Sequence, residues 1–134
     1  FVPFKHTIDM LTDKLRKDGI TTEVIRGDVS AARRTDIFKR FQENDDPKVL
    51  VIQPQSAAHG VTLTAANTVI WWAPTSSLET YAQANARVHR SGQDQKCTVV
   101  HIQGSYVEKR VYSLLNNRLD IHTKMIDLYK EVLD

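Results

Sequence analysis

Near the middle of the chain lies the sequence Gln83-Ala-Asn-Ala-Arg87-Val-His-Arg90-Ser-Gly-Gln93. Residues three and four positions apart lie on one face of a helix, so the spacing predicts that Gln83, Arg87 and Arg90 share a helical face that stops at Gly92. An arginine is always charged, and its planar fork of donors matches phosphate oxygens. The pattern fits arginines that stabilise charge on a transferred phosphoryl group, or a solvated basic helix end favoured by the helix dipole.

The same eleven residues resemble motif six of the superfamily-two helicases, in the form used by Swi/Snf-like DNA translocases. RNA helicases of the DEAD-box group usually carry His-Arg-x-Gly-Arg-x-Gly-Arg at this point, whereas this chain has Gln93 and Asp94. The resemblance implies that Arg87 and Arg90 are catalytic arginines that also contact the nucleotide phosphates. It implies that Gln83 orients their helix or contacts the nucleotide.

Strand-like and helical patterns alternate along the chain. Strands are expected at residues 22–25, 48–52, 68–72 and 97–102, with Phe1–Phe4 as the tail of another. Helices are expected before Gly19, after a cap at Ser30, after a capping box at Ser76–Glu79, and over most of 105–134. The alternation predicts an α/β fold, with a mostly parallel sheet and helices on both faces. The runs 48–52 and 68–72 are continuously apolar, as in strands covered on both faces.

Composition sets the outer bounds of the protein class. The 134 residues are 41% hydrophobic and 25% charged, which is ordinary for one globular domain with its own core. The net charge of +2 is too small to indicate nucleic-acid binding by itself, so any basic surface must be local. A single cysteine, Cys97, excludes an internal disulfide and is typical of the cytoplasm or, in a eukaryote, the nucleus. No apolar run approaches the roughly 18 residues of a membrane span, so no membrane partner is expected.

A second block, Val49 to Ile70, resembles motif five of the same family. A strand there runs into a turn of small residues, where backbone N–H groups can approach a phosphate. The family usually has two glycines where this chain has Ala57 and Ala58, and asparagine where it has Thr62. The resemblance implies that the turn binds the tracking strand and that Gly60 lies on the nucleotide side. The expected nucleic-acid contacts in this turn are Gln55, Ser56 and His59. The alternative is a turn that only permits strand–helix packing.

A third block extends the resemblance over nearly the whole chain. Residues 1–15 resemble the motif-four strand and helix, and residues 25–41 resemble the element that follows, with Arg33 or Arg34 as its arginine. The expected nucleic-acid contacts here are Lys5, Gly27 and Ser30. The order of motifs implies that residues 1–104 form the second RecA-like lobe, of P-loop NTPase type. Residues 105–134 would form a helical extension that packs on this lobe or braces the first one.

Two motifs of such motors are missing from the sequence. It contains neither a Gly-x-x-x-x-Gly-Lys-Ser/Thr phosphate loop nor an acidic Asp-Glu box, and it starts without methionine, inside an expected strand. The chain is therefore interpreted as a fragment, the second lobe alone. The resemblance implies that the intact protein hydrolyses ATP with Mg²⁺, which the first lobe mainly binds. The implied partners are that first lobe and the DNA backbone, expected to be duplex and read without sequence preference.

Other chemistries fit the sequence less well. The five histidines show no spacing with cysteines or carboxylates that suits zinc, so no metal ligand is expected in this chain. Trp71 and Trp72 alternate faces on a strand and are interpreted as packing residues. Two alternative functions remain at this point: a RecA-like lobe that only docks a partner, and a lobe of an RNA helicase.

Overall fold

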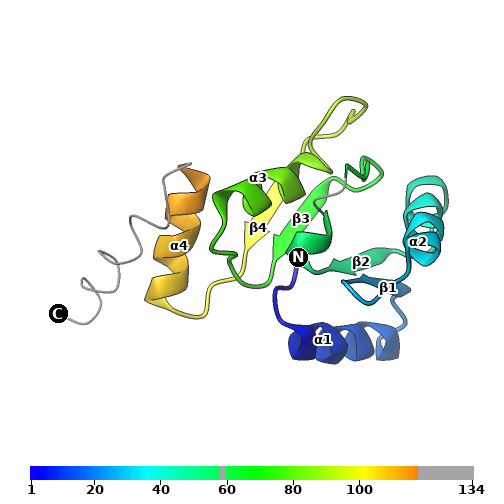
Figure 1. Ribbon diagram of the computed structural model, residues 1–134, viewed down its shortest axis with the longest axis horizontal. Helices are drawn as coiled ribbons and strands as arrows, with labels where there is room; N and C mark the ends of the chain where they lie inside the picture. Colours follow the sequence, from blue (N-terminus) through cyan, green and yellow to red (C-terminus); the bar gives the residue numbers. More distant parts are fainter. Residues whose placement is uncertain (58–59, 118–134) are drawn as a thin grey trace.

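The computed structural model describes residues 1–57 and 60–117. Its strands are β1 (Thr22–Ile25), β2 (Val49–Ile52), β3 (Thr68–Trp71) and β4 (Thr98–His101). Its helices are α1 (Lys5–Lys17), α2 (Ala31–Glu43), the short 3-10 helix η1 (Pro54–Ala57), α3 (Leu78–Ala86) and α4 (Tyr106–Asn116). The expected alternation of strands and helices is therefore confirmed (Figure 1).

The strands form two parallel pairs, β1 with β2 and β3 with β4. The first residues of the chain lie between them. The Phe1 amine donates to the Ile70 carbonyl at 2.6 Å, the Trp72 N–H donates to the Phe1 carbonyl at 3.0 Å, and the Val2 N–H donates to the Ile52 carbonyl at 3.0 Å. Phe1 and Val2 belong to the expected strand tail, and their hydrogen bonds connect β2 to β3. No regular strand is assigned at these two residues.

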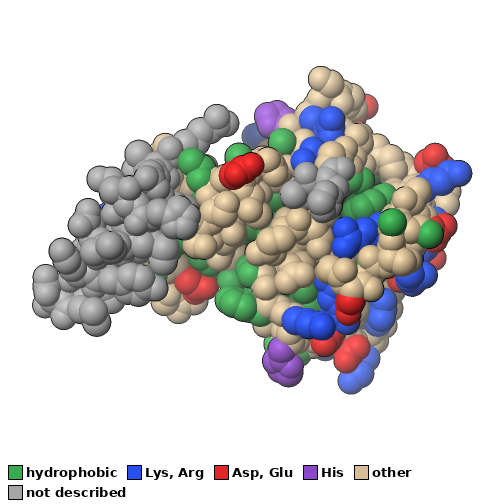
Figure 2. Space-filling model, in the orientation of Figure 1, with side chains coloured by type: hydrophobic (Ala, Val, Ile, Leu, Met, Phe, Trp, Pro, Cys, Tyr) green, Lys and Arg blue, Asp and Glu red, His purple; other side chains and the backbone are tan. Residues whose placement is uncertain are grey.

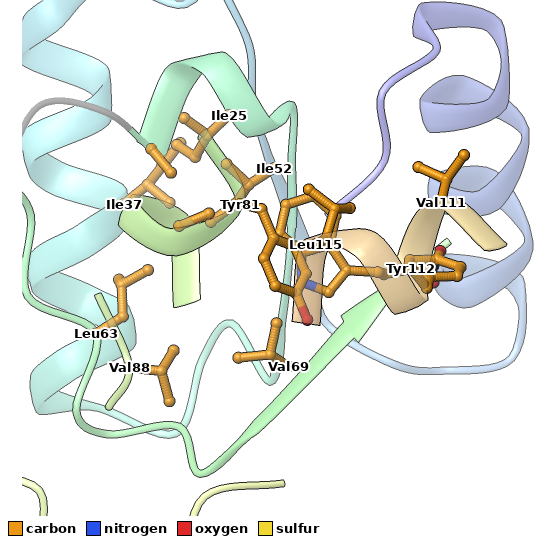
Figure 3. Packing of buried hydrophobic residues seen from close by; sticks show 13 residues of the cluster. Ile25, Ile37, Ile52, Leu63, Val69, Tyr81, Val88, Val111, Tyr112 and Leu115 are labelled. Carbon is orange, nitrogen blue, oxygen red and sulfur yellow. Dashed lines mark hydrogen bonds between the residues drawn. The ribbon is translucent and has the colours of Figure 1, made fainter. Parts of the chain in front are cut away.

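Helices cover both faces of the strands (Figure 1). On one face, Ile8 of α1 packs with Val2 and Val51 in a small buried cluster. On the other face, a larger cluster joins β1, β2 and β3 to α2, α3 and α4, and Figure 3 shows Tyr112 and Leu115 of α4 within it. The regular α/β arrangement predicted from the sequence follows from these two apolar layers.

Coverage of β3 is less complete than the apolar run 68–72 predicts. Val69 and Trp71 are 5% and 0% exposed, but Ile70, which points to the opposite face, is 48% exposed. On the neighbouring strand, Val100 is 39% exposed. The reason is that α1 packs mainly against β1 and β2, so the expectation of two covered faces is wrong for β3 within the described residues.

The helix that leads to the arginine pair is shorter than expected. Its N-cap is Ser77, whose side chain accepts from the Thr80 N–H at 3.1 Å, so the capping box predicted at Ser76–Glu79 is wrong by one residue. α3 ends at Ala86, not near Gly92, and Arg87 is its C-cap. The N–H groups of Arg87 and Val88 bond to carbonyls three residues back, which tightens the last turn, and the Val88 side chain is buried.

An aromatic cluster beneath α4 contains His101 of β4. His101 stacks on Tyr112, with ring centroids 4.1 Å apart, and its Nε2 lies 2.7 Å from the Tyr81 hydroxyl. Burial lowers the pKa of His101 below its ordinary value of 6.5. The folded protein therefore favours the neutral imidazole of His101.

We expect the stability of this chain to fall as the pH drops below about 6.5. In that range a histidine of the unfolded chain takes up a proton that folded His101 resists, and the loss levels off once the pH passes the lowered pKa. Thermal melts of the wild type and His101→Gln between pH 7.5 and 5 measure this. Burial also lowers the pKa of the Phe1 amine to about 5, so the variant should lose only the part of the pH dependence that comes from His101. His6→Gln, at an exposed position, should keep all of it. An unchanged pH profile in His101→Gln would contradict the assignment.

Candidate nucleotide and nucleic-acid site

The expected nucleic-acid contacts follow the carboxyl ends of the parallel strands. The Gln53 N–H donates to the Ile25 carbonyl at 2.9 Å, so the segments that follow β1 and β2 leave the sheet side by side. The segment after β1 leads to the start of α2, and the segment after β2 forms η1. Lys5 follows the Phe1–Val2 bridge at the start of α1. Ligands of open parallel sheets bind at this edge.

Both arginines of the central motif reach back to the small-residue turn. Arg87 Nε donates to the Ala57 carbonyl at 2.8 Å, and Arg90 Nη1 donates to the Val61 carbonyl at 3.2 Å. Their side chains are thus fixed on either side of residues 58–59. Arg87 is half-buried, whereas Arg90 is exposed. A guanidinium has five N–H donors, and each of these bonds uses one, so the two groups keep donors for an anion at the same turn.

Gln93 ties the two motifs together. Its Nε2 lies 2.7 Å from the Ala66 carbonyl, 3.1 Å from the Val88 carbonyl and 3.2 Å from the Thr64 carbonyl. The Leu63 N–H also donates to the Arg87 carbonyl at 2.8 Å. The segment that carries the arginines is therefore held to residues 63–66 by a side chain and by the backbone. Gln93 was part of the quoted motif, but sequence reasoning gave it no role.

The two other residues expected near the nucleotide have different environments. Gln83 lies on α3, and its Nε2 donates to Glu79 Oε1 at 3.1 Å, one turn earlier on the helix. Gly60 is exposed and has φ +75°, a conformation in which an L side chain is strained. No atom lies within 4 Å of a Cβ built on it, so the backbone conformation explains the glycine and crowding does not. Gln83 makes no bond to Arg87 or Arg90 among the described interactions.

Lys5, Gly27 and Ser30 are brought to one place. The Lys5 ammonium lies 3.9 Å from Asp28, the neighbour of Gly27, with both side chains more than half exposed. Ser30 is the N-cap of α2 and accepts from the Arg33 N–H at 3.2 Å. An N-terminal helix turn with a lysine beside it suits an anion. Exposed ion pairs such as the one of Lys5 are weak, so a phosphate could compete with the carboxylate.

Two arginines near this loop have separate contacts. Arg34, half-buried, donates to the Val29 and Arg26 carbonyls at 3.1 and 2.9 Å, which fixes the loop that contains Gly27. Arg33 instead lies 3.1 Å from Glu23. The sequence left open which arginine belongs to the motif. Of the two, Arg34 is the one that supports the loop backbone.

The turn residues after β2 are only partly available. Gln55 is exposed on η1, whereas Ser56 is 7% exposed and its N–H donates to the Gln53 carbonyl at 2.8 Å. A Ser56 side chain in this position is better placed to pack the turn than to reach a ligand. His59, the third expected contact, lies outside the described residues.

The charge around the site is mixed. Arg26 lies 2.7 Å from Asp9 and 3.0 Å from Asp28, and these carboxylates raise its pKa. Figure 2 shows basic side chains interspersed with acidic and uncharged ones on the face in view. Such a surface favours local contacts with a backbone phosphate over a broad positive field.

The chain is similar to a known family of domains over most of its length. The model of the helicase conserved C-terminal domain matches residues 1–92. This chain belongs to that family. Within it, residues 1–92 include the whole turn after β2 and both arginines, and the predicted identification as the C-terminal domain of a helicase is confirmed.

Individual relatives agree with this membership. The chain is 33% identical over 129 residues to the bifunctional helicase and thymine dioxygenase JBP2 of Leishmania tarentolae, covering 93% of this chain and 11% of that protein. It is 30% identical over 128 residues to chromodomain-helicase-DNA-binding protein 1-like of Mus musculus, covering 95% and 14%. This helicase C-terminal domain therefore spans about a tenth of the length of such relatives.

The fold resembles that of a solved ATPase domain. The C-terminal part of the Fun30 ATPase domain superposes with a TM-score of 0.77 at 22% identity, covering 86% of this chain and 37% of that one. The predicted RecA-like fold is thereby confirmed. Among residues 1–57 and 60–117, no helix has the length and apolar character needed to span a bilayer, and no cluster of three or more His, Cys, Asp or Glu side chains could hold a metal ion.

Proposed function

We propose that this domain is the second motor lobe of an ATP-dependent, DNA-stimulated helicase or translocase, and that it supplies the arginines of an ATP site shared with a first lobe. The observation that carries the proposal is the fixation of Arg87 and Arg90 on the carbonyls of Ala57 and Val61. Two always-charged donors are thereby held at one turn, in the segment that runs from the carboxyl end of β2 to the amino end of β3.

The roles of the individual residues follow from their chemistry. Arg87 and Arg90 would stabilise negative charge on the phosphates when the lobes close, because preorganised donors cost no reorganisation at the moment of reaction. Gln83 would orient α3, from a side chain already held by Glu79. Gly60 would let the backbone of the turn approach the nucleotide. The chain contains no phosphate loop, so ATP and Mg²⁺ would be bound mainly by the first lobe, where the ion supplies charge neutralisation.

We further propose that the carboxyl edge beside the arginines contacts a nucleic-acid backbone. Lys5, Gly27 and Ser30 lie together there, and Gln55 is exposed on the adjacent η1. His59 belongs to the same proposal from its place in the motif. Contacts of this kind position a strand without reading its bases, so little sequence preference is expected.

The domain division is part of the same proposal. Residues 1–104 would form the lobe, and residues 105–134 would form a helical extension. Val111, Tyr112 and Leu115 of α4 are buried in the main core, which supports packing of this part on the lobe. The alternative, in which residues 105–134 brace the first lobe, stays a prediction, and residues 118–134 lie outside the described part of the chain.

The direct test compares the 134-residue chain with the intact protein in a steady-state ATP assay with saturating duplex DNA. We expect the chain alone to show no turnover, because it lacks a phosphate loop, and the intact protein to hydrolyse ATP. A preparation of the chain with Arg87 and Arg90 both replaced by alanine controls for contaminating enzymes. Turnover by the wild-type chain that the double variant lacks would refute the proposal of a site shared between lobes.

A further inference from the structure

A turn formed by residues 63–66 lies between η1 and β3, and we call it the 63–66 turn. It closes on itself through one backbone bond, in which the Ala66 N–H donates to the Leu63 carbonyl at 3.1 Å. Irregular backbone of this kind depends on other groups to satisfy its remaining donors and acceptors. Two glutamine side chains, Gln42 and Gln93, do so here from different parts of the chain.

Gln42 reaches the 63–66 turn from the last turn of α2. Its Nε2 donates to the Thr64 hydroxyl oxygen at 2.7 Å, and its Oε1 accepts from the Ala65 N–H at 2.9 Å. Both ends of the amide are thus used, on two consecutive residues of the turn. The side chain is half-buried, and its helix is anchored in the main core by Ile37 and Phe41. Gln42 therefore ties the turn to a fixed element.

The same turn is bonded to the segment that carries the arginines. The Leu63 N–H donates to the Arg87 carbonyl at 2.8 Å. Two residues before Leu63, the Val61 carbonyl accepts from Arg90 Nη1 at 3.2 Å. A shift of the 63–66 turn would therefore move the backbone of Arg87 and the anchor of Arg90 together.

We propose that Gln42 is a positioning residue for the two arginines. It sets the 63–66 turn, and through that turn it sets the places of Arg87 and Arg90. The inference rests on the function proposed above, because the places of the arginines matter if these residues act on phosphates. A misplacement of about 1 Å can cost on the order of 10²-fold in rate. Gln42 lies at the opposite end of α2 from Ser30, so it should affect the reaction and not the binding of nucleic acid.

Gln42→Met in the intact protein tests the catalytic consequence. Methionine has nearly the same length and suits a helix, but it has no N–H donor and only a weak acceptor. We expect the nucleic-acid-stimulated kcat to fall about tenfold, since Gln93 still holds the turn, with the KM for ATP and the affinity for duplex DNA changed less than about twofold. Gln42→Glu should recover most of the rate, because a carboxylate accepts from both the Ala65 N–H and the Thr64 hydroxyl. Glu43→Met, at the next and exposed position of α2, is the matched control and should keep the wild-type rate.

Amide hydrogen exchange on the same intact proteins tests the position of the turn without reference to activity. The Leu63 N–H reports on the bond to the Arg87 carbonyl, and we expect it to exchange at least about tenfold faster in Gln42→Met than in the wild type. The Gln53 N–H, which donates to the Ile25 carbonyl at 2.9 Å, should keep its protection. A thermal melt of each variant ensures that all assays are made below its transition.

Two results would overturn the inference and leave the proposed function standing. In the first, the Leu63 N–H exchanges at the wild-type rate in Gln42→Met, so the turn does not depend on the glutamine. In the second, Arg90→Ala is impaired but Gln42→Met turns over as fast as Glu43→Met, so the turn does not place the arginines.

Two further results would also count against it. If Gln42→Glu is as slow as Gln42→Met, the two hydrogen bonds of the amide are not the cause of the loss. If folded Arg87→Ala and Arg90→Ala both turn over normally, the proposed function fails and this inference fails with it, even where the Leu63 N–H exchanges faster as expected. The exchange measurement thus distinguishes the two failures.

Discussion

Replacing Arg90 by alanine in the intact protein is expected to lower nucleic-acid-stimulated ATP turnover by at least about a hundredfold, since arginine fingers elsewhere contribute roughly 10³–10⁵ in rate. Arg87→Ala should have an effect of the same order. The reason is that these guanidinium groups would stabilise charge that appears only in the transition state. Steady-state hydrolysis, with a thermal melt of each variant, measures both effects.

The controls separate catalysis from support of the turn. Arg16 also donates to a backbone carbonyl, that of Thr22, at 2.8 Å, but it lies at the end of α1, so Arg16→Ala should keep near-normal turnover. Arg90→Lys should fail like Arg90→Ala, because an ammonium cannot reproduce the planar fork. Near-normal hydrolysis by folded Arg87→Ala and Arg90→Ala would make the pair an ordinary surface charge cluster.

The largest expected effect on stability is that of Trp71→Ala. Trp71 is fully buried, packs against Phe1 and Tyr81 with ring centroids 4.8 and 5.1 Å away, and donates from Nε1 to Asn85 at 2.9 Å. Its removal should lower the free energy of unfolding by about 3–5 kcal/mol. That is a large share of the roughly 5–15 kcal/mol by which domains are stable.

Trp72→Ala is the matched control for this prediction. Trp72 is the next residue along, but it is only half-buried and lines the cavity between β2 and β3. Its truncation should cost clearly less than that of Trp71 in urea denaturation of the 134-residue chain. Equal losses for the two variants would contradict the view that the core of this domain is centred on the face of β3 that packs against α3 and α4.

Much of the fold could be predicted from the sequence because its signals are local. The apolar runs became β2 and β3, Ser30 became the cap of α2, and Gly19, with φ +81°, follows α1 where a stop was expected. Signals that depend on neighbouring elements were misread. The helix of the arginine pair ends at Ala86 because Arg87 and Val88 turn into contact with residues 63–66, and no periodicity in the sequence records that contact.

The sequence could name candidate residues for the site, but it could not show the hydrogen bonds that hold them. The motif pointed to Arg87 and Arg90, yet their anchorage on Ala57 and Val61 depends on packing between segments some 30 residues apart. The role of Gln93 was missed for the same reason, although a glutamine amide carries N–H donors that can bond carbonyls. The burial of Ser56 follows from η1, which the sequence did not predict, and its contact with nucleic acid stays a prediction.

The central claim is that this lobe belongs to a motor driven by ATP and coupled to DNA. The most direct measurement is the ATP turnover of the intact protein without nucleic acid, with duplex DNA of mixed sequence, and with single-stranded RNA. The account predicts a clear rise with duplex DNA, insensitive to its sequence and weakened by salt, and a much smaller rise with RNA. Turnover that responds to RNA alone, or no turnover under any of these conditions, would contradict it.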